Sequence, residues 1–507
     1  EISSIAFHPT DPTMIYILDT YSANSVRNYV YRSINSGVSY SLSEQIMGNA
    51  NAAGKIAITP DCSNCVYFAS ESGVWKSTNT AQNFTFLSNP SEAFDGFAVS
   101  DVDESFMIYG YVDIMHSIDN GVNFVKTSWW SLGSAEHGSG DFDQRYGGSN
   151  NYIHADLRVA KSVNGVFYVG TDGLFAKSED NGLAWTHLSS GLGIRENYKL
   201  GASQSNHYRS ISGSQDNGTS IRQKDQWIEF YGADGMECLI HPLNYDWMLG
   251  SVQYGGRRRT LDGGQTQSGV SPAGQSGSGN GGWEAPLAYD PNHQMRIYNF
   301  SDSVYVSENF GSTWAYRGAP NSFTGTINQA AIAENNSNII VISKGSAIEK
   351  SINAGATFTS IKNNLPNYTI EDIAFHPKND NIILVCYARY QNDNSKVYIT
   401  YNGGGNWTNI TYNLGNMPVQ SVVVDHSANF NIYLGGEIGV YTMPIDGNTW
   451  VLHNPNLPNT TIEELEIVNG SNTLKAATWG RGLWEYSLLG RLDYPAILIT
   501  NITDLPT

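Results

Sequence analysis

The segment Ser117-Ile118-Asp119-Asn120-Gly121-Val122-Asn123-Phe124 decides the fold, because its frame occurs ten times along the chain. A small polar residue opens each copy, Asp or Asn stands third, Gly or Ala stands fifth, and an aromatic residue usually stands eighth. Eight copies keep the first three features, and their third positions are Asn35, Asn79, Asp119, Asp180, Asp262, Asn309, Asn353 and Asn402. Two degenerate copies run from Ser220 to Trp227 and from Met443 to Trp450. A period mostly in the forties predicts a modular array.

The chemistry of this box predicts a tight turn between two strands. The Asp or Asn side chain accepts hydrogen bonds from nearby backbone N–H groups and closes the turn. The Gly tolerates a positive φ without steric cost. The aromatic residue returns under the hairpin and covers the core of the module. The eight Asp and Asn residues are therefore expected to be structural.

Composition agrees with a β-rich protein whose surface carries few charges. Gly accounts for 51 of 507 residues, aromatic residues for 12% and charged residues for 15%, which is typical of turn-rich β-structure. The net charge of -19 argues against nucleic acid and anionic membranes as partners. No apolar run of 18 residues occurs, so the sequence predicts no membrane-spanning segment.

One repeat unit illustrates the predicted architecture. Residues 370–377 alternate in polarity and end at a proline, 381–387 form a second apolar run, 396–400 lead into a box, and 407–410 follow it. Four antiparallel strands per period are the pattern of a propeller blade. We therefore predict an all-β fold, a β-propeller of four-stranded antiparallel blades with Asp-box turns.

The number of blades follows from the number of boxes. After the last box, residues 462–488 supply three further strands without a box. Ten boxes and this final unit predict one wide ring of about ten blades over residues 1–489, whereas two rings of seven would require about 14 units. Residues 490–507 are expected to be a linker toward a further C-terminal region.

The four cysteines fall into two groups. Cys62 and Cys65 lie in a predicted turn, where a local disulfide is favoured. A thioredoxin-type redox site would need a helix N-terminus, and a zinc site would need a second pair of ligands. Cys238 and Cys386 lie in apolar strand-like stretches and are expected to be buried.

Propeller geometry predicts where a ligand would bind. The loops that join strands two and three, and those that join consecutive blades, gather on one face around the central channel, and the boxes lie on the opposite rim. An inserted segment, Thr127 to Asn151, enters the channel face. The candidate ligand-binding residues predicted on that face are Trp129, Trp130, His154, Asp156, Gln215, Asp216, Asn217 and Asp234.

Several alternatives remain open for these residues. Asp172 and Asp216 are the best pair for a glycosidase, which needs two carboxyl groups, but Asp-Gly and Asp-Asn-Gly also form ordinary hairpin turns. The pair Trp129-Trp130 would suit stacking on sugar rings, or covering a blade edge.

Metal binding is a further alternative at the same face. Asp156, Asp216 and Asp234 offer oxygen ligands of the kind that Ca²⁺ prefers. His154 and Asp156, two residues apart on a strand, supply two ligands at most, which is too few for zinc. No cofactor is required by the sequence, and Ca²⁺ is the metal to test.

The chain resembles the Asp-box β-propellers, a group that includes sialidases, xyloglucanases and the luminal domain of sortilin. It is more closely similar to secreted Bacteroidetes surface proteins that end in a type IX secretion sorting domain. The stretches that carry the resemblance are His154-Ala155-Asp156, Leu200 to Gln204, Gly213 to Thr219, Gly232 to Cys238 and Ala477 to Trp484. The resemblance implies a secreted or cell-surface protein, with residues 490–507 leading to a sorting domain.

Three functions follow as hypotheses. The first is a binding or adhesion module for a polysaccharide or a surface protein, exported by type IX secretion. The second is a glycoside hydrolase that acts on a β-glucan-like polysaccharide through Asp172 and Asp216. The third is a structural component of a surface, gliding or secretion assembly. Sialidase activity is disfavoured, because the chain has few arginines and they do not follow the inner strands.

Overall fold

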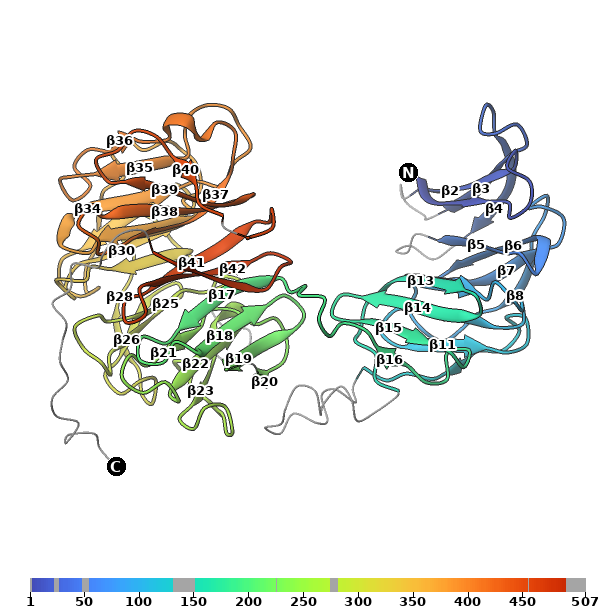
Figure 1. The fold of residues 1–507 in the computed structure, drawn as a ribbon, viewed down its shortest axis with the longest axis horizontal. Helices are drawn as coiled ribbons and strands as arrows, with labels where there is room; N and C mark the ends of the chain where they lie inside the picture. Colours follow the sequence, from blue (N-terminus) through green and yellow to red (C-terminus); the bar gives the residue numbers. More distant parts are fainter. Residues whose placement is uncertain are drawn as a thin grey trace. The chain divides into compact units, whose positions relative to one another are not determined.

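The computed structural model describes residues 2–21, 27–47, 54–130, 151–224, 226–273, 281–454 and 456–488. These residues form eleven antiparallel sheets, ten of four strands and one of three, and each sheet is built from consecutive strands (Figure 1). The described helices are two three-residue turns, η1 (Gln253–Gly255) and η2 (Tyr412–Leu414). The predicted all-β fold of propeller blades is confirmed.

The chain divides into two compact units after Leu192. The first unit has four sheets. The first sheet is β1 (Ile2–Phe7), β2 (Ile15–Tyr21), β3 (Arg27–Ser33) and β4 (Ser41–Met47). The second is β5 (Lys55–Thr59), β6 (Cys62–Ser70), β7 (Gly73–Ser77) and β8 (Thr85–Ser88). The third is β9 (Gly96–Val99), β10 (Met107–Gly110), β11 (Ile114–Ser117) and β12 (Val125–Lys126). The fourth is β13 (Leu157–Val163), β14 (Val166–Thr171), β15 (Phe175–Ser178) and β16 (Thr186–His187).

The described part of the second unit has seven sheets. The first two are β17 (Asn197–Ala202), β18 (Arg209–Ser214), β19 (Gly218–Gln223), β20 (Gln226–Tyr231), then β21 (Leu239–Ile240), β22 (Met248–Val252), β23 (Gly256–Thr260), β24 (Ser268–Gly269). The next two are β25 (Leu287–Tyr289), β26 (Ile297–Phe300), β27 (Val304–Ser307), β28 (Ala315–Gly318), then β29 (Gln329–Ile332), β30 (Ile340–Lys344), β31 (Ala347–Ser351), β32 (Thr359–Ser360). The fifth and sixth are β33 (Asp372–His376), β34 (Asn379–Cys386), β35 (Val397–Thr400), β36 (Thr408–Asn409), then β37 (Val419–Val424), β38 (Asn431–Gly436), β39 (Gly439–Pro444), β40 (Val451–Leu452). The last is β41 (Ile462–Val468), β42 (Thr473–Thr478) and β43 (Leu483–Ser487).

Neighbouring sheets pack face to face through separate apolar cores. In the first unit, Tyr16, Leu18 and Val30 of the first sheet bury their side chains against Val66 and Phe68 of the second. Comparable clusters join the later sheets of both units. Each sheet therefore depends on a neighbour to cover its apolar face, as blades do.

The seven sheets of the second unit close on themselves. The first strands of consecutive sheets contact one another from β17 to β41, and β41 in turn contacts β17. This differs from the single ring of about ten blades that the number of boxes predicted. Since the inner edge of β41 is already occupied by β17, the seven sheets form a ring of their own.

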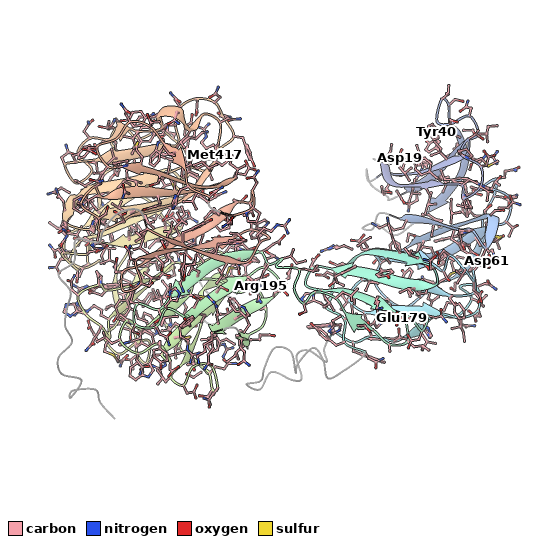
Figure 2. The ribbon with its side chains drawn as sticks, in the orientation of Figure 1. Asp19, Tyr40, Asp61, Glu179, Arg195 and Met417 are labelled. Carbon is pink, nitrogen blue, oxygen red and sulfur yellow. A yellow bond between two sulfur atoms is a disulfide. The ribbon has the colours of Figure 1, made fainter. Side chains whose placement is uncertain are left out.

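Side chains make this closure specific. The carboxylate of Glu464 accepts a hydrogen bond from the backbone N–H of Leu200, and Glu466 Oε2 accepts one from Ala202 at 2.6 Å. Farther along, Gln204 Nε2 donates to the carbonyl of Ile467 at 2.9 Å. The carbonyl of Arg195, labelled in Figure 2, accepts the N–H of Gly480 at 2.9 Å. The exposed edge of a strand carries unpaired N–H and C=O groups, and bonds of this kind satisfy them.

The boxes form the turns between third and fourth strands. Ser117 Oγ donates to Asp119 Oδ1 at 2.9 Å and accepts the N–H of Gly121 at 3.0 Å. Asp119 Oδ1 also accepts the N–H of Asn123 at 2.8 Å. The same three bonds recur in the other seven complete copies. The box side chains are thus committed to their own turns.

The four cysteines are arranged as the sequence predicts. Cys62 and Cys65 form a disulfide with Cα atoms 5.2 Å apart, while Cys238 and Cys386 are buried free thiols.

Within the described part of the chain, no helix is long and apolar enough to cross a membrane. Most of the inserted segment (131–150) and the predicted linker (490–507) lie outside the described residues.

The box geometry predicts the effect of removing its buried hydroxyl. In the unsubstituted protein, Ser351 Oγ accepts a hydrogen bond from the buried N–H of Gly355 at 2.9 Å. The substitution Ser351→Ala removes this acceptor. An unsatisfied buried donor costs about 1–3 kcal/mol, so we expect the free energy of unfolding to fall by that amount in urea denaturation. Ile352→Ala, at the exposed adjacent position, is the control and should change it by less than about 0.5 kcal/mol. Equal effects of the two substitutions would contradict this role of the hydroxyl.

Candidate functional site

The sequence-predicted residues fall in both units. His154, Asp156 and Asp172 belong to the fourth sheet of the first unit and its loops. The Asp172 carboxylate accepts two hydrogen bonds from Arg158, from Nε to Oδ1 and from Nη2 to Oδ2, each at 2.7 Å. Arg158 also pairs with Asp95 at 3.2 Å. Asp172 is therefore held in a bidentate ion pair, which lowers its suitability as a proton donor or nucleophile.

The neighbouring residues of that loop also have local partners. His154 Nδ1 lies 3.0 Å from the carbonyl of Ala155. Asp156 adopts a left-handed backbone with φ of 65°. Burial and a hydrogen bond to Asp156 raise the pKa of the Tyr111 hydroxyl. These contacts shape the loop that leads into β13.

The second unit brings the other predicted residues together. Gln215, Asp216 and Asn217 form the turn between β18 and β19, and Asp234 follows β20. The N–H of Asp216 donates to Asp234 Oδ1 at 2.7 Å, and Gln253 donates to the other oxygen of Asp234. The buried Asp234 carboxylate thus connects the β18–β19 turn with the segment after β22.

The proposed calcium ligands are divided in the same way. Asp156 lies in the first unit, whereas Asp216 and Asp234 lie in the second. Among the described residues, the one group of three side chains with metal-ligand spacing is Cys62, Cys65 and Glu104, and its two thiols are joined in the disulfide.

Trp129 and Trp130 stand at the beginning of the inserted segment and are both exposed. The N–H of Trp130 donates to Asp113 Oδ1 at 2.7 Å, and Lys126 Nζ lies 5.9 Å from the centre of the Trp129 ring. Trp130 is therefore anchored through its backbone, and both rings remain partly accessible.

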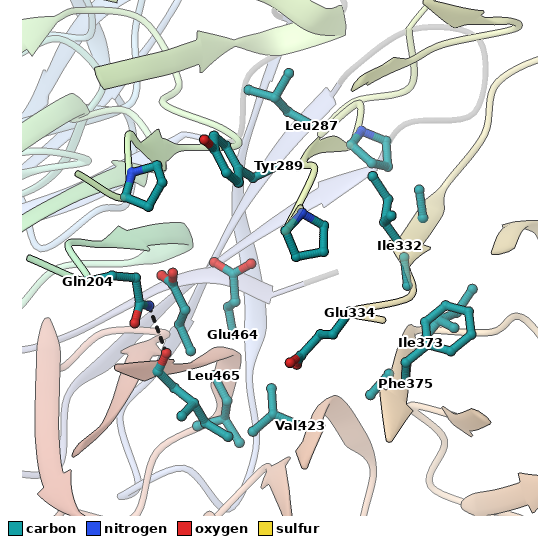
Figure 3. A pocket seen from close by; sticks show the side chains of 18 of the residues that line it. Gln204, Leu287, Tyr289, Ile332, Glu334, Ile373, Phe375, Val423, Glu464 and Leu465 are labelled. Carbon is teal, nitrogen blue, oxygen red and sulfur yellow. Dashed lines mark hydrogen bonds between the residues drawn. The ribbon is translucent and has the colours of Figure 1, made fainter. Parts of the chain in front are cut away.

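The central channel of the second unit forms a large cavity. Its volume is about 1140 Å³, and its lining includes residues of six of the seven first strands together with Glu237, just before β21. Figure 3 shows the lining, in which the carboxylates of Glu334 and Glu464 point into the cavity. The cavity has the size of a small-molecule or oligosaccharide site.

Carboxylates gather in this channel around one lysine. Lys199 Nζ lies 3.3 Å from Glu284 Oε2. Burial opposes the charge of Lys199, but nearby carboxylates outweigh it and raise its pKa. The other acidic members of the cluster are Glu237, Glu371, Asp372, Glu463, Glu464 and Glu466.

Burial raises the pKa of these carboxyl groups. The pKa of Glu463 rises to about 7 through burial, which Lys199 opposes and the carboxylates of Glu284 and Glu371 reinforce. Burial also raises the pKa of Glu466 to about 8, against the hydrogen bond from Ala202. Shifts of this size cluster at functional sites, although structural networks also produce them.

Some acidic members of the cluster accept hydrogen bonds from the backbone, and others do not. Glu464 and Glu466 close the ring, and Asp372 Oδ2 accepts the N–H of Val422 at 2.8 Å. The carboxylates of Glu371 and Glu463, in contrast, accept no hydrogen bond from the described residues. These two groups are therefore available for a ligand.

Four aromatic rings, of which those of Tyr254 and Trp283 are exposed and those of Tyr198 and Trp479 are half-buried, lie on the same side of the ring of blades. We call this side the channel-entry face; there the first strands begin and the second strands turn into the third. Tyr254, in the β22–β23 turn, packs edge to face on Trp283 with ring centres 5.5 Å apart. Tyr198 packs on Trp479 in the same manner at 5.1 Å. Tyr254 has a left-handed backbone, with φ of 61°.

A second depression opens on the channel-entry face. Its volume is about 550 Å³, and its lining is Ile194, Glu437, Ile438, Asn459, Thr460, Thr461, Trp479, Gly480 and Arg481. One aromatic ring, one guanidinium and several hydroxyl or amide groups are the kinds of group that orient small ligands.

The residues predicted from the sequence did not include Lys199, Glu284, Glu371 or Glu463. A signal for two of them exists, because Glu371 lies two residues before the recurring first-strand motif Ile373 to Pro377 and Glu463 is the second residue of the inner strand β41. Glu463, at the start of an innermost strand, lines the channel, whereas the residues predicted from the sequence lie mainly in loops.

The channel carboxyls predict how stability depends on pH. An ordinary Glu has a pKa of 4.5, but Glu463 and Glu466 bind their protons up to about 7 and 8 in the folded state. Their contribution to stability is fully present below pH 4.5 and is lost as pH rises through 7 to 8. We expect the Tm of the second unit to fall by a few degrees between pH 5 and pH 8.

Differential scanning calorimetry of Glu463→Gln should reveal a smaller fall, because one of these groups no longer ionises. Glu334→Gln is the matched control, since Glu334 lines the channel and pairs with His426 at 3.0 Å instead of with this cluster. An unchanged pH dependence in Glu463→Gln would contradict the assignment.

Comparisons with known proteins place the fold. The family model for Sortilin-Vps10 (sortilin, neurotensin receptor 3) matches residues 302–430. No curated protein sequence matches the chain. Among solved structures, the GH74 xyloglucanase from Xanthomonas campestris aligns with a TM-score of 0.62 at 12% identity, covering 96% of this chain and 74% of that one. An ancestral GH74 enzyme aligns at 0.60 and 14% identity, covering 98% and 87%. With the repeated box turns, these matches identify the chain as a multi-blade β-propeller of the Asp-box type.

Proposed function

We propose that the second unit binds a polysaccharide across its channel-entry face. The observation that carries this proposal is the Tyr254–Trp283 pair. A bulky residue in the left-handed region costs about 1–3 kcal/mol and persists only where its surroundings impose it. The N–H of Tyr254 donates to the carbonyl of Trp283 at 3.1 Å, so the strained turn holds two exposed rings in fixed positions.

The surroundings of this pair suit a sugar. Aromatic faces stack on the apolar faces of pyranose rings, while amide and carboxylate groups bind the hydroxyls. Glu284 follows Trp283 directly and borders the channel cluster through Lys199. The depression lined by Trp479 and Arg481 provides a second group of such contacts on the same face.

Charge narrows the class of polysaccharide. The net charge of the chain is -19. Anionic chains, such as uronate or sulfated polymers, would be repelled, whereas neutral chains would not. A neutral, β-glucan-like polysaccharide is the ligand that we infer.

The proposal includes an extracellular location. A disulfide such as Cys62–Cys65 persists in oxidising compartments, which supports a secreted or cell-surface protein. Adhesion to surface polysaccharide, and export by type IX secretion, extend the proposal on the strength of the sequence resemblance. A role as a structural part of a surface, gliding or secretion assembly would use the same exposed face.

Hydrolysis is a second candidate function, favoured by Glu463. A general acid works best when its pKa lies near the working pH, and that of Glu463 is raised to about 7. The Glu371 carboxylate, which influences Glu463, would serve as its partner. The GH74 structural neighbours are compatible with this activity but show the fold alone.

Loss of the aromatic pair tests binding. We expect Tyr254→Ala and Trp283→Ala each to weaken binding to a soluble β-glucan about tenfold or more in affinity electrophoresis, because a stacking surface is lost. Tyr316→Ala is the matched control, since Tyr316 is an exposed tyrosine on the outer strand β28 of the same unit. If the glucan slowed both variants as strongly as it slows the unsubstituted protein, the proposed binding face would be wrong.

Release of reducing ends from the same polysaccharide tests hydrolysis. If the unit is a hydrolase, Glu463→Gln should lower kcat by about 10²-fold or more with little change in KM, because the proton donor is lost while the binding face is kept. Glu334→Gln should leave kcat unchanged. Intact polysaccharide after long incubation with the unsubstituted protein would eliminate this second candidate and leave binding alone.

A further inference from the structure

The disulfide of the first unit closes a short bulge at the start of β6. Cys62 pairs with Thr59 of β5, whereas the next paired residue of β6, Val66, lies opposite Ile58. The residues between Cys62 and Val66 therefore loop out of the ladder, as in a β-bulge. The Cys62–Cys65 bond joins the two ends of this loop. We call residues 62–65 the disulfide bulge.

The backbone of the disulfide bulge does not require sulfur. The same register shift occurs in the second unit at residues 379–382, which contain no cysteine. In each bulge the third residue, Asn64 or Asn381, accepts an N–H of the following box turn through its carbonyl, at 2.9 and 2.8 Å. A disulfide that closes so short a loop also restricts the unfolded chain least. The shape of the bulge therefore does not explain the pair of sulfurs.

The two cysteines differ in their access to solvent. Cys65 is 1% exposed and packs in the core between the second and third sheets. Cys62 is half-buried at the margin of the same core. Thiol–disulfide exchange needs one sulfur that an incoming thiolate can reach and a second sulfur that leaves. Cys62 is suited to the first role, and Cys65 to the second.

A carboxylate from the third sheet approaches both sulfurs. Glu104 lies in the β9–β10 turn, and one of its carboxylate oxygens and the two Sγ atoms all lie within 4.8 Å of one another. The backbone N–H of Glu104 donates to Asp61 Oδ2 at 3.0 Å, which holds the turn beside the disulfide bulge; Asp61 is labelled in Figure 2. A proton acceptor therefore stands next to the sulfurs, at a distance that one water molecule spans.

Two further side chains fix the charge around this carboxylate. Lys76 Nζ donates to Glu104 Oε2 at 2.9 Å, and the hydroxyl of Tyr67 donates to the same oxygen. Burial, and then the carboxylate of Glu104, raise the pKa of Tyr67, so its hydroxyl keeps its proton. A neighbouring ammonium group stabilises a thiolate. Lys76 thus brings the positive charge that a helix N-terminus supplies at other cysteine pairs of this spacing.

We propose that the Cys62–Cys65 pair is a thiol–disulfide exchange site that oxidises a dithiol in a polypeptide substrate. The first substrate thiol passes its proton to Glu104 and attacks Cys62 Sγ, so that the bond to Cys65 breaks and a mixed disulfide forms at Cys62. Cys65 leaves as a thiolate, which Lys76 stabilises and which then takes the proton from Glu104.

The second substrate thiol completes the exchange. It attacks the substrate sulfur of the mixed disulfide, and its proton passes through Glu104 to Cys62. The substrate departs as a disulfide, and the protein retains two electrons and two protons as a dithiol. A single turnover therefore needs no other oxidant.

Reduction of the folded protein tests the proposal on the full chain. The probe is a peptide with two cysteine thiols, and alkylation followed by mass analysis counts the thiols formed at Cys62 and Cys65. We expect reduction while circular dichroism remains that of the folded protein. Glu104→Gln should slow it at least about tenfold and flatten its dependence on pH, because the proton acceptor is lost.

Glu71→Gln is the matched control, since Glu71 is a carboxylate at the opposite end of β6, and it should leave the rate of reduction unchanged. A disulfide that stays oxidised until the protein unfolds would overturn the proposal. Equal rates for Glu104→Gln and Glu71→Gln would overturn it as well.

Trapping of the mixed disulfide tests the separate roles of the two cysteines. In Cys65→Ser, the Cys62 thiol should attack the oxidised form of the peptide and stay joined to it, because no second thiol resolves the adduct. In Cys62→Ser, the buried Cys65 should form its adduct at least about tenfold more slowly. In urea both variants should react alike, because burial is lost. Equal rates in the folded variants would contradict these roles and overturn the proposed exchange.

Discussion

The second unit depends on satisfying the inner edges of its first strands. Each first strand pairs with one neighbour in its own sheet, so its other edge would leave N–H groups without acceptors. Side chains from the adjoining blade supply those acceptors, as Glu466 does for Ala202 and Asp372 for Val422. The first unit uses the same device, since Ser4 Oγ accepts the N–H of Ile56 at 3.2 Å. Where the acceptors belong to acidic side chains, closing the ring also gathers carboxyl groups along the channel, and burial raises the pKa of Glu464 and Glu466.

This constraint separates structural from functional carboxylates. Groups that accept lateral N–H bonds are needed for closure, and replacing them would alter the ring before it altered a ligand. Glu371 and Glu463 are also largely buried, but they accept no such bonds. The raised pKa of Glu463 therefore reflects mainly the loss of hydration on burial. Lys199 offsets part of the repulsion, which allows this many acidic groups to remain together.

The structure of a single blade could be predicted from the sequence, whereas the closure of seven blades into a ring could not. The box at Ser117 depends on contacts within eight residues, so its turn and its four-stranded context could be predicted from local chemistry. Ring closure depends on β17 meeting β41, far apart in the chain, and no local pattern encodes that contact. For the same reason, His154 and Gln215 were predicted on one face, although they belong to different compact units. The partner of Asp172, Arg158, lies on the adjacent strand β13 and was likewise not visible in the turn motif.

Exposed apolar residues have two meanings in this fold, and position in the repeat distinguishes them. Ile118, Val122 and Ile352 are exposed at the tips of box turns, where their neighbours are polar and no blade ever packs. Such single residues need no partner. Ile5 and Phe175 instead occupy the strand positions at which other blades of the same unit bury their side chains. A repeat architecture therefore provides its own reference for each surface, because the buried equivalents in the next blade show which strand positions pack between blades.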